Sequence, residues 1–257
     1  MLSKPWQSCR VFGYSDVSKR RRCMSNPMSQ PSQKPEDYLQ AGDLIDSGNT
    51  HVVDFTNRHR VSGEAPVDAA VRLYLAVRDE ITYDPYRVGP DPRYFRASDC
   101  LATGRGFCIP KAALLAACAR VIGIPARVGY ADVRNHLSST RLDELIGGNV
   151  YTWHSYTDLY LDGQWVKATP AFNKELCQRF GVHVLEFDGR NDSLLQEFDQ
   201  SGNRHMEYEG QRGVFSDVPY ELILADFEKH HPRWLHNRAD LDDELFGHKA
   251  KAGNDMA

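Results

Sequence analysis

The stretch GRGFCIPKAALLAACARVIGIPARVGY, residues 104–130, predicts a buried helix that begins beside a cysteine. A glycine-containing turn precedes Cys108, and Pro110 fits the first helical turn, where its missing N–H costs nothing. Residues 111–122 are almost wholly apolar, which is typical of a helix buried on all sides. The following Gly-Ile-Pro segment ends the helix, and residues 125–133 are predicted to form the first strand.

A β-hairpin is predicted from two runs, NVYTWHSYTDLYL (149–161) and QWVKATPAFN (164–173), joined by Asp162-Gly163. Asp-Gly between aromatic and β-branched runs is the strongest short-range hairpin signal. With a two-residue turn, the numbers of opposite residues add up to 325. His154 is therefore expected opposite Ala171, in the middle of a strand.

The whole pattern predicts an α+β fold in which this helix, which precedes the sheet in the chain, is buried against an antiparallel sheet. Residues 66–81 have helical periodicity, residues 183–188 (HVLEFD) are predicted to form a strand, and a helix is expected near 217–230. We expect one domain over residues 36–235. Polar composition predicts a disordered tail at 1–35, in which Met24 is an alternative start, and a charged tail at 236–257.

Composition argues against several classes of protein. The 31 basic and 35 acidic residues give a formal charge of −4, so nucleic acid is not an expected partner. No apolar run approaches the roughly 18 to 20 residues of a membrane span, and no secretory signal is visible, so a cytosolic protein with no membrane partner is expected. Six cysteines without C-x-x-C spacing predict free thiols. The sequence predicts no particular oligomeric state.

Cys108 is a candidate nucleophile because of its place at a helix start. The helix dipole and the unpaired backbone N–H groups there stabilise a thiolate, and the same N–H groups can bind an oxyanion. The alternative is that Cys108 is a small core residue that only packs.

A thiol nucleophile needs a base, and His154 is the candidate because it lies on a predicted strand downstream of the cysteine. Alternation along the hairpin places Thr169 and Asn173 on the same face, each one diagonal step from His154. Asp158 shares that face but is two residue pairs away. No cofactor or metal is expected, since no ligand spacing supports a site built from the remaining histidines, which include His51, His59, His230 and His231.

The segments ASDCLATGRGFCIPKAALLAACARVIGIPARV and WHSYTDLYLDGQWVKATP resemble the transglutaminase-like superfamily, cysteine enzymes with a papain-like fold. The shared features are the Gly-x-Cys start, the Leu-Leu-x-x-x-x-Arg helix, Gly-Ile-Pro-Ala-Arg, and a histidine followed by Gly-x-Trp-Val. The resemblance implies a papain-like core with Cys108 as nucleophile and His154 as base. The family's aspartate falls on Thr169, which carries no charge, and Asn173 is the alternative group to orient the imidazole.

Two functions follow from this resemblance. The first is a cysteine-dependent acyl-transfer enzyme that acts on amide bonds of a peptide, a protein or a small amide, with hydrolysis favoured because no acidic calcium-binding loop of the crosslinking enzymes is visible. The second, motivated by Thr169, is a binding or scaffold module without catalysis. In either case the loops 82–96 and 134–148 are expected to flank the cleft.

Overall fold

The computed structural model describes residue 32 and residues 34–237. The predicted tails, 1–35 and 236–257, therefore lie almost entirely outside the described residues, as do Met24 and two of the six cysteines, Cys9 and Cys23. The other four cysteines, Cys100, Cys108, Cys118 and Cys177, are free and buried, as the sequence predicts.

Helices and short strands fill the first half of the described chain. They are η1 (Pro35–Tyr38), α1 (Thr50–His59), α2 (Pro66–Glu80), β1 (Thr82–Tyr83), η2 (Pro92–Tyr94), α3 (Ala97–Thr103), β2 (Arg105–Gly106) and α4 (Cys108–Val121). The main strands follow, with helices between them: β3 (Ala126–Asn135), α5 (Thr140–Ile146), β4 (Val150–Leu161), β5 (Gln164–Ala168), α6 (Lys174–Phe180), β6 (Met206–Phe215), α7 (Tyr220–His230) and α8 (Pro232–Leu235).

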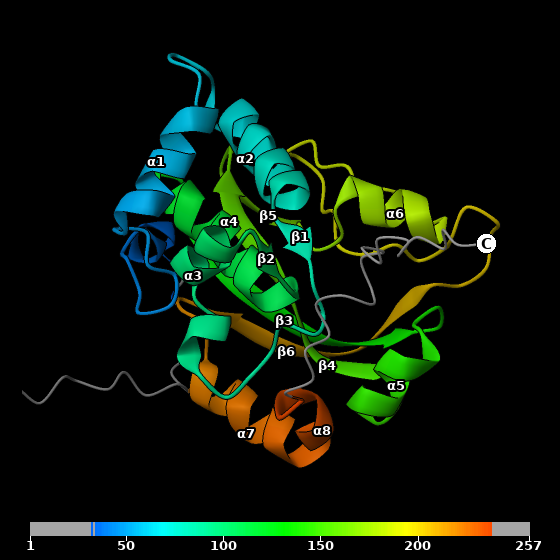
Figure 1. Ribbon diagram of the computed structural model, residues 1–257. Coiled ribbons are helices and arrows are strands. Elements are labelled where there is room, and N and C mark those ends of the chain that lie inside the picture. Colours follow the sequence, from blue (N-terminus) through cyan, green and yellow to red (C-terminus); the bar gives the residue numbers. More distant parts are fainter. Residues whose placement is uncertain (1–31, 33, 238–257) are drawn as a thin grey trace, which may run out of the picture. The chain divides into compact units, whose positions relative to one another are not determined.

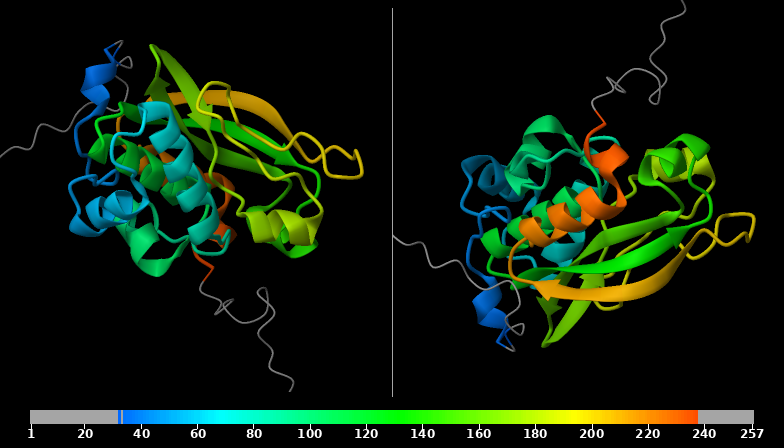
Figure 2. Two further views of the ribbon diagram at one scale, coloured as in Figure 1. Left: turned by 90° about the horizontal axis from the view of Figure 1, so that it is seen from above. Right: turned by 90° about the horizontal axis from the view of Figure 1, so that it is seen from below.

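The main sheet has four antiparallel strands in the order β5-β4-β3-β6. Helix α4 packs on β4 and β3, and α1 and α2 pack on α4, so these helices lie on one side of the sheet (Figures 1 and 2). The α+β fold with a buried helix against an antiparallel sheet is therefore confirmed.

The predicted hairpin register is confirmed over β4 and β5. Leu161 pairs with Gln164 and Thr157 with Ala168, so the paired numbers add up to 325. The ladder stops at Ala168, earlier than predicted, because the N–H of Thr169 donates to Ser193 O at 2.9 Å and the next residue is a proline without an N–H.

Helix α4 is buried along its length, as its apolar sequence predicts. Residues 108–120 are all buried, including two that carry charge, Lys111 and Arg120. The guanidinium of Arg120 donates to the carbonyl oxygens of Gln40, Ala126 and Ser216. Because these carbonyls belong to three separate segments, Arg120 ties the carboxyl end of α4 to the segment after η1, to the start of β3 and to the segment after β6.

The C-terminal third departs most from the sequence-based expectations. The predicted strand 183–188 is wrong, because this segment bonds to side chains instead of to a neighbouring strand: Leu185 O accepts from the Tyr74 hydroxyl at 2.9 Å and from Arg78 at 2.8 Å. The predicted helix near 217–230 is confirmed as α7. Strand β6 and the short helices α6 and α8 were not predicted.

Helices α7 and α8 return to the amino-terminal half and pack against the start of α4. The Phe227 and Trp234 rings contact each other at 5.0 Å between centroids, and Trp234 contacts Phe107 at 5.7 Å. The Trp234 indole N–H also donates to Pro85 O at 2.6 Å. The last described helices therefore close over the residue that precedes Cys108.

No helix within residues 34–237 has both the length and the apolar character needed to cross a membrane.

Candidate active site

Cys108 is the first residue of α4, so its position is set by a regular helix start. Phe107 is the N-cap, with extended backbone, and Gly106 precedes it in β2. A Cβ on Gly106 would lie 2.7 Å from Cys100 Sγ and 3.0 Å from Pro110 Cγ, closer than side chains tolerate. The close approach of α3 to the start of α4 therefore requires a glycine two residues before the thiol.

Residue Cys108 is 9% exposed, and burial raises the pKa of its thiol to about 11. The backbone N–H groups of Ser155, Ile109 and Cys108 itself act in the opposite direction and lower the pKa. The helix start thus supplies N–H donors as predicted, but the expectation of a thiolate is wrong for this closed arrangement. Desolvation of the charged form outweighs the donors.

His154 lies in β4 opposite Ala131, directly after an irregularity in the strand. The register between β3 and β4 shifts here: between the pairs Ala131–His154 and Val133–Tyr151, one residue of β3 faces two of β4. Trp153 has a positive φ of 60°, a conformation that non-glycine residues rarely adopt. This β-bulge redirects the chain just before the histidine, which simple alternation did not predict.

Two charged side chains hold the bulge. The N–H of Trp153 donates to Asp132 Oδ1 at 3.1 Å, and the same oxygen accepts from Arg212 Nε. The Arg212 guanidinium also lies 4.8 Å from the centroid of the Trp153 ring. The unusual backbone at Trp153 is therefore stabilised by residues on β3 and β6.

Burial lowers the pKa of His154 to about 4, so its imidazole is neutral at pH 7. Cys108 and His154 line one partly open cavity of about 60 Å³. Because the pKa of the thiol is raised and that of the imidazole is lowered, the two groups face this cavity in their neutral forms. The N–H of Ser155, the residue after His154, also acts on the Cys108 sulfur.

The third predicted residue does not complete a hydrogen-bonded triad. Among the described residues, neither His154 Nε2 nor Thr169 Oγ1 has a hydrogen-bond partner, although both atoms are buried. Thr169 uses its backbone instead, since its carbonyl accepts from the Tyr74 hydroxyl at 3.2 Å. No hydrogen bond therefore joins His154 Nε2 to Thr169 Oγ1.

The other two candidates on this face are engaged elsewhere. Asn173 Oδ1 accepts from the N–H of Tyr83 at 3.2 Å, which ties the start of α6 to β1. Asp158 is buried and forms an ion pair with Arg127 at 2.8 Å. Neither side chain is bonded to His154.

Several lining residues of the cavity were not predicted, and they come from α7, α8 and the turn between them. His231 is the most notable, because it is a second buried imidazole in the same cavity as Cys108 and His154. Its Nδ1 is 2.8 Å from Ile146 O and its Nε2 is 2.9 Å from Thr152 Oγ1. Burial lowers its pKa. Since it lies 77 residues after His154, no local pattern could have placed it there.

The described residues contain no group of three His, Cys, Asp or Glu side chains that could hold a metal ion. His59 pairs with Glu80 at 3.1 Å and His230 lies 3.8 Å from Asp226. In the sequence, both histidines are considered as metal ligands and have no supporting spacing. In the structure each lies beside a carboxylate, Glu80 of α2 for His59 and Asp226 of α7 for His230.

Similarity between this chain and individual known proteins is low. A search of curated proteins finds no match. Among solved structures, the 1.9 Å crystal structure of a candidate cysteine protease from Cytophaga hutchinsonii is similar, with 13% sequence identity and a TM-score of 0.42. The match covers 74% of this chain and 57% of that one, so this chain spans a little over half of that protein's length.

A family model described as the transglutaminase-like superfamily matches residues 54–170, a segment that contains Cys108, His154 and Thr169. At the level of the family, the match indicates a cysteine-type enzyme. Residues 54–170 of this chain belong to the transglutaminase-like superfamily.

Proposed function

We propose that this protein is a cysteine-dependent hydrolase of amide bonds, with Cys108 as the nucleophile and His154 as the base. One observation carries the proposal: the two side chains line one small, partly open cavity at the start of a buried helix. Such a cavity excludes bulk water and strengthens the interactions of any charge that develops inside it. The substrate would be a peptide, a protein or a small amide.

The reaction begins from the neutral pair. As the Cys108 sulfur attacks the carbonyl carbon, its proton moves to His154, and a carbon–sulfur bond forms. The carbonyl oxygen gains negative charge, which the N–H groups at the start of α4 can stabilise. The carbon–nitrogen bond then breaks, and His154 returns the proton to the departing amine. Water then attacks the thioester carbon and gives a proton to His154, the carbon–sulfur bond breaks, the carboxylic acid leaves, and the sulfur takes the proton back from His154.

We favour water over an amine as the second nucleophile because of the size of the cavity. A volume of about 60 Å³ has room for water, which needs at least about 10 to 15 Å³ by a comparable measure. A lysine side chain is several times larger than a water molecule and would compete with the acyl group for this volume. Hydrolysis is therefore ranked ahead of crosslinking.

A binding or scaffold module without catalysis is the second candidate function. It is favoured by the unpaired His154 Nε2 and Thr169 Oγ1, since a neutral residue replaces the expected aspartate and no described residue forms a hydrogen bond with Nε2. The cytosolic location and the absence of a nucleic-acid partner stay predictions from the sequence in both cases.

Hydrolysis of a tryptic peptide mixture, followed by mass spectrometry of new termini, tests the proposal. Two proteins are compared in a Cys9→Ser, Cys23→Ser background: one with Cys108 and one with Cys108→Ala. We expect new termini only with Cys108, and a thioester-linked peptide on Cys108 after rapid acid quench. Equal cleavage by both proteins would rule out Cys108 as nucleophile, and no cleavage by either would favour the non-catalytic module.

A further inference from the structure

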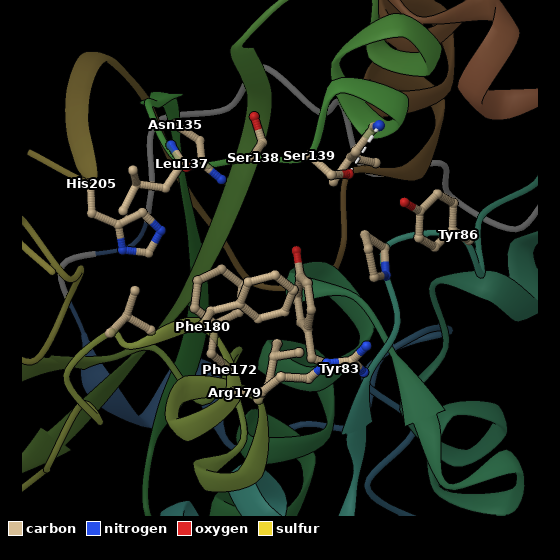
Figure 3. Close-up of a pocket in the computed structure, with 14 residues that line it drawn as sticks. Tyr83, Tyr86, Asn135, Leu137, Ser138, Ser139, Phe172, Arg179, Phe180 and His205 are labelled. Carbon is tan, nitrogen blue, oxygen red and sulfur yellow. Dashed lines mark hydrogen bonds between the residues drawn. The ribbon is translucent and has the colours of Figure 1, made fainter. Parts of the chain in front are cut away.

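A second, larger cavity of about 150 Å³ lies next to the proposed active site. Its walls come from the end of β1 and the segment after it, the segment that leads into α5, helix α6, and the residue that precedes β6. Figure 3 shows the rings of Tyr83, Phe172 and Phe180 on one side of the space, and Leu137, Asn135 and His205 on the other. The loops that the sequence analysis expected beside the cleft, 82–96 and 134–148, both contribute lining residues.

The two cavities adjoin each other. Five residues line both of them: Tyr83, Pro85, Asn135, Leu142 and Phe172. Because these residues are shared, no further layer of protein lies between the larger cavity and the cavity that contains the Cys108 thiol. This position suits a binding subsite for part of a substrate whose reacting bond lies at Cys108.

The size and lining of the larger cavity favour an aromatic ring. An engineered cavity of about 150 Å³ lined by apolar side chains binds benzene in another protein, so a phenyl ring fits this volume. Aromatic side chains on the wall can make edge-to-face contacts with such a ring. Among the described lining residues there is no Asp or Glu, whereas Arg179 is present, so a cationic side chain would meet no compensating charge.

The rim of this cavity also exposes large apolar side chains. Phe180 is 56% exposed and Leu137 is 39% exposed, and both line the cavity. Exposed apolar groups gathered at the mouth of a pocket are typical of a surface that binds a ligand. A peptide that fills the cavity would cover both of them.

We propose that this cavity binds the aromatic side chain of a peptide substrate, at a residue close to the amide bond that Cys108 attacks. The proposal rests on the proposed function, and it adds the class of substrate. Substrates with Phe or Tyr at that residue should react faster than those with Ala, and substrates with Lys should not gain.

Active-site-directed alkylation tests the proposal without a known substrate. The probes are four acetylated dipeptidyl chloromethyl ketones, Phe-Gly, Gly-Phe, Ala-Gly and Lys-Gly, and iodoacetamide serves as a reagent with no side chain. The measured quantity is the second-order rate of Cys108 alkylation, divided by the iodoacetamide rate. We expect at least one Phe probe to exceed the Ala probe by about 10- to 100-fold, the gain typical of burying an aromatic side chain.

Variants of the cavity localise the preference. Leu176→Trp fills the cavity and Phe180→Ser removes an exposed part of its rim, and each should reduce the normalised Phe preference toward that of the Ala probe. Phe198→Ser is the matched control, because Phe198 is 48% exposed and is not among the lining residues. Thermal unfolding checks folding; if Leu176→Trp does not fold, Phe180→Ser decides.

The outcomes separate this proposal from the proposed function. Equal normalised rates for all probes, or a Phe preference that survives both cavity variants, would overturn the subsite. If iodoacetamide and the ketones all fail to label Cys108, the nucleophile assignment fails instead. In that event, saturation-transfer NMR of acetyl-Phe-Gly-methylamide with Cys108→Ala judges the subsite alone: binding lost in Phe180→Ser supports it, and no binding overturns it.

Discussion

Cys108 and His154 meet in one cavity, but the protein holds them in place by different means. Cys108 starts a regular helix that is buried throughout, and the residues before it fit a local pattern of turn and cap. His154 follows a β-bulge whose central residue, Trp153, has a positive φ, and the bulge depends on Asp132 and Arg212 from other strands. One half of the pair is set by local sequence and the other by distant contacts.

This difference teaches how the two halves should respond to mutation. The position of Cys108 is backed by the core packing of α4, so changes around it should cost stability before they change geometry. The position of His154 depends on a few polar contacts at the edge of regular structure, so changes there should alter reactivity with little loss of stability. The predictions below test this contrast, starting with the largest expected effect.

Removing either reactive group should abolish catalysis and leave the fold intact. Cys108→Ala and His154→Ala are each expected to lower the rate of peptide hydrolysis by about 10⁴-fold or more, because nucleophile and base act as a unit. Near-native melting temperatures would show that the loss is chemical. Measurable hydrolysis by Cys108→Ala would contradict the nucleophile assignment, and full hydrolysis by His154→Ala would move the role of base to another group, with His231 the first to examine.

Restoring a carboxylate at the third position should shift the charge state of the pair. In the present protein the pKa of Cys108 is raised to about 11 and that of His154 is lowered to about 4, so the rate of iodoacetamide labelling should climb with pH up to about 11. In Thr169→Asp, a nearby carboxylate favours the imidazolium, which raises the pKa of His154 and in turn lowers that of Cys108. Labelling at pH 7 should then rise by about 100-fold.

Peptide mapping in the Cys9→Ser, Cys23→Ser background measures this labelling at Cys108 alone. Thr169→Val is the control for loss of the unpaired hydroxyl, and it should leave the profile unchanged. If Thr169→Asp also leaves the profile unchanged while Asn173→Ala collapses it, the orienting role belongs to Asn173. An unchanged profile in all of these variants would favour the non-catalytic module.

The sequence predicted those parts of the fold that depend on neighbours in the chain. The all-apolar segment of α4 and the Asp162-Gly163 turn are local signals, and both led to correct elements with the correct hairpin register. They also identified Cys108 and His154 as candidates, and the structure places both in one cavity. A helix start and a tight turn are determined within a few residues, so a single sequence is enough to find them.

The parts that were missed depend on contacts across the chain. Strand β6 has only one buried residue, contains two glycines, and pairs with β3, more than 70 residues earlier, so its own sequence shows no alternation. The bulge at Trp153 requires Asp132, and His231 reaches the cavity only because α7 and α8 fold back onto α4. The shift of the Cys108 pKa is likewise a result of tertiary burial, which outweighs the effect of the helix start.

Releasing the bulge should affect catalysis moderately and stability little. Asp132→Ala removes the acceptor of the Trp153 N–H, so His154 loses its fixed approach to the cavity, and kcat is expected to fall about tenfold with KM nearly unchanged. Asp192→Ala is a matched control, since Asp192 also accepts a backbone N–H, that of Lys167 at 2.9 Å, and pairs with a cation. Equal effects of the two variants on kcat would show that the bulge does not position His154.

Replacement of Lys111 in α4 should have the smallest effect on activity. This lysine lies in the packed helix that holds Cys108. Its side chain is 0% exposed, and its ammonium donates to the carbonyl oxygens of Arg78 at 3.0 Å and of Ile81, which caps the carboxyl end of α2. Burial lowers its pKa from 10.5 to about 7. The lysine therefore affects the stability of the packing behind Cys108, while its contacts do not include His154.

The direction of the pH effect follows from the shifted pKa of Lys111. Below pH 7 the ammonium is charged in both the folded and the unfolded state, so the folded protein carries the full cost of burying it. Between about pH 7 and 10.5 the folded state loses this proton while the unfolded state keeps it. The contribution of Lys111 to the free energy of unfolding therefore increases with pH in this range. Lys111→Met removes that gain.

Urea unfolding at pH 6, 7.5 and 9 measures the effect. The free energy of unfolding of the wild type should increase relative to that of Lys111→Met by about 1 to 3 kcal/mol across this range. Lys167→Met, which removes the same charge from a partly exposed lysine of β5, should give a nearly constant difference. A constant difference for Lys111→Met as well would mean that the buried ammonium keeps its proton in the folded state, and the support behind Cys108 would then be a permanently charged cap on α2.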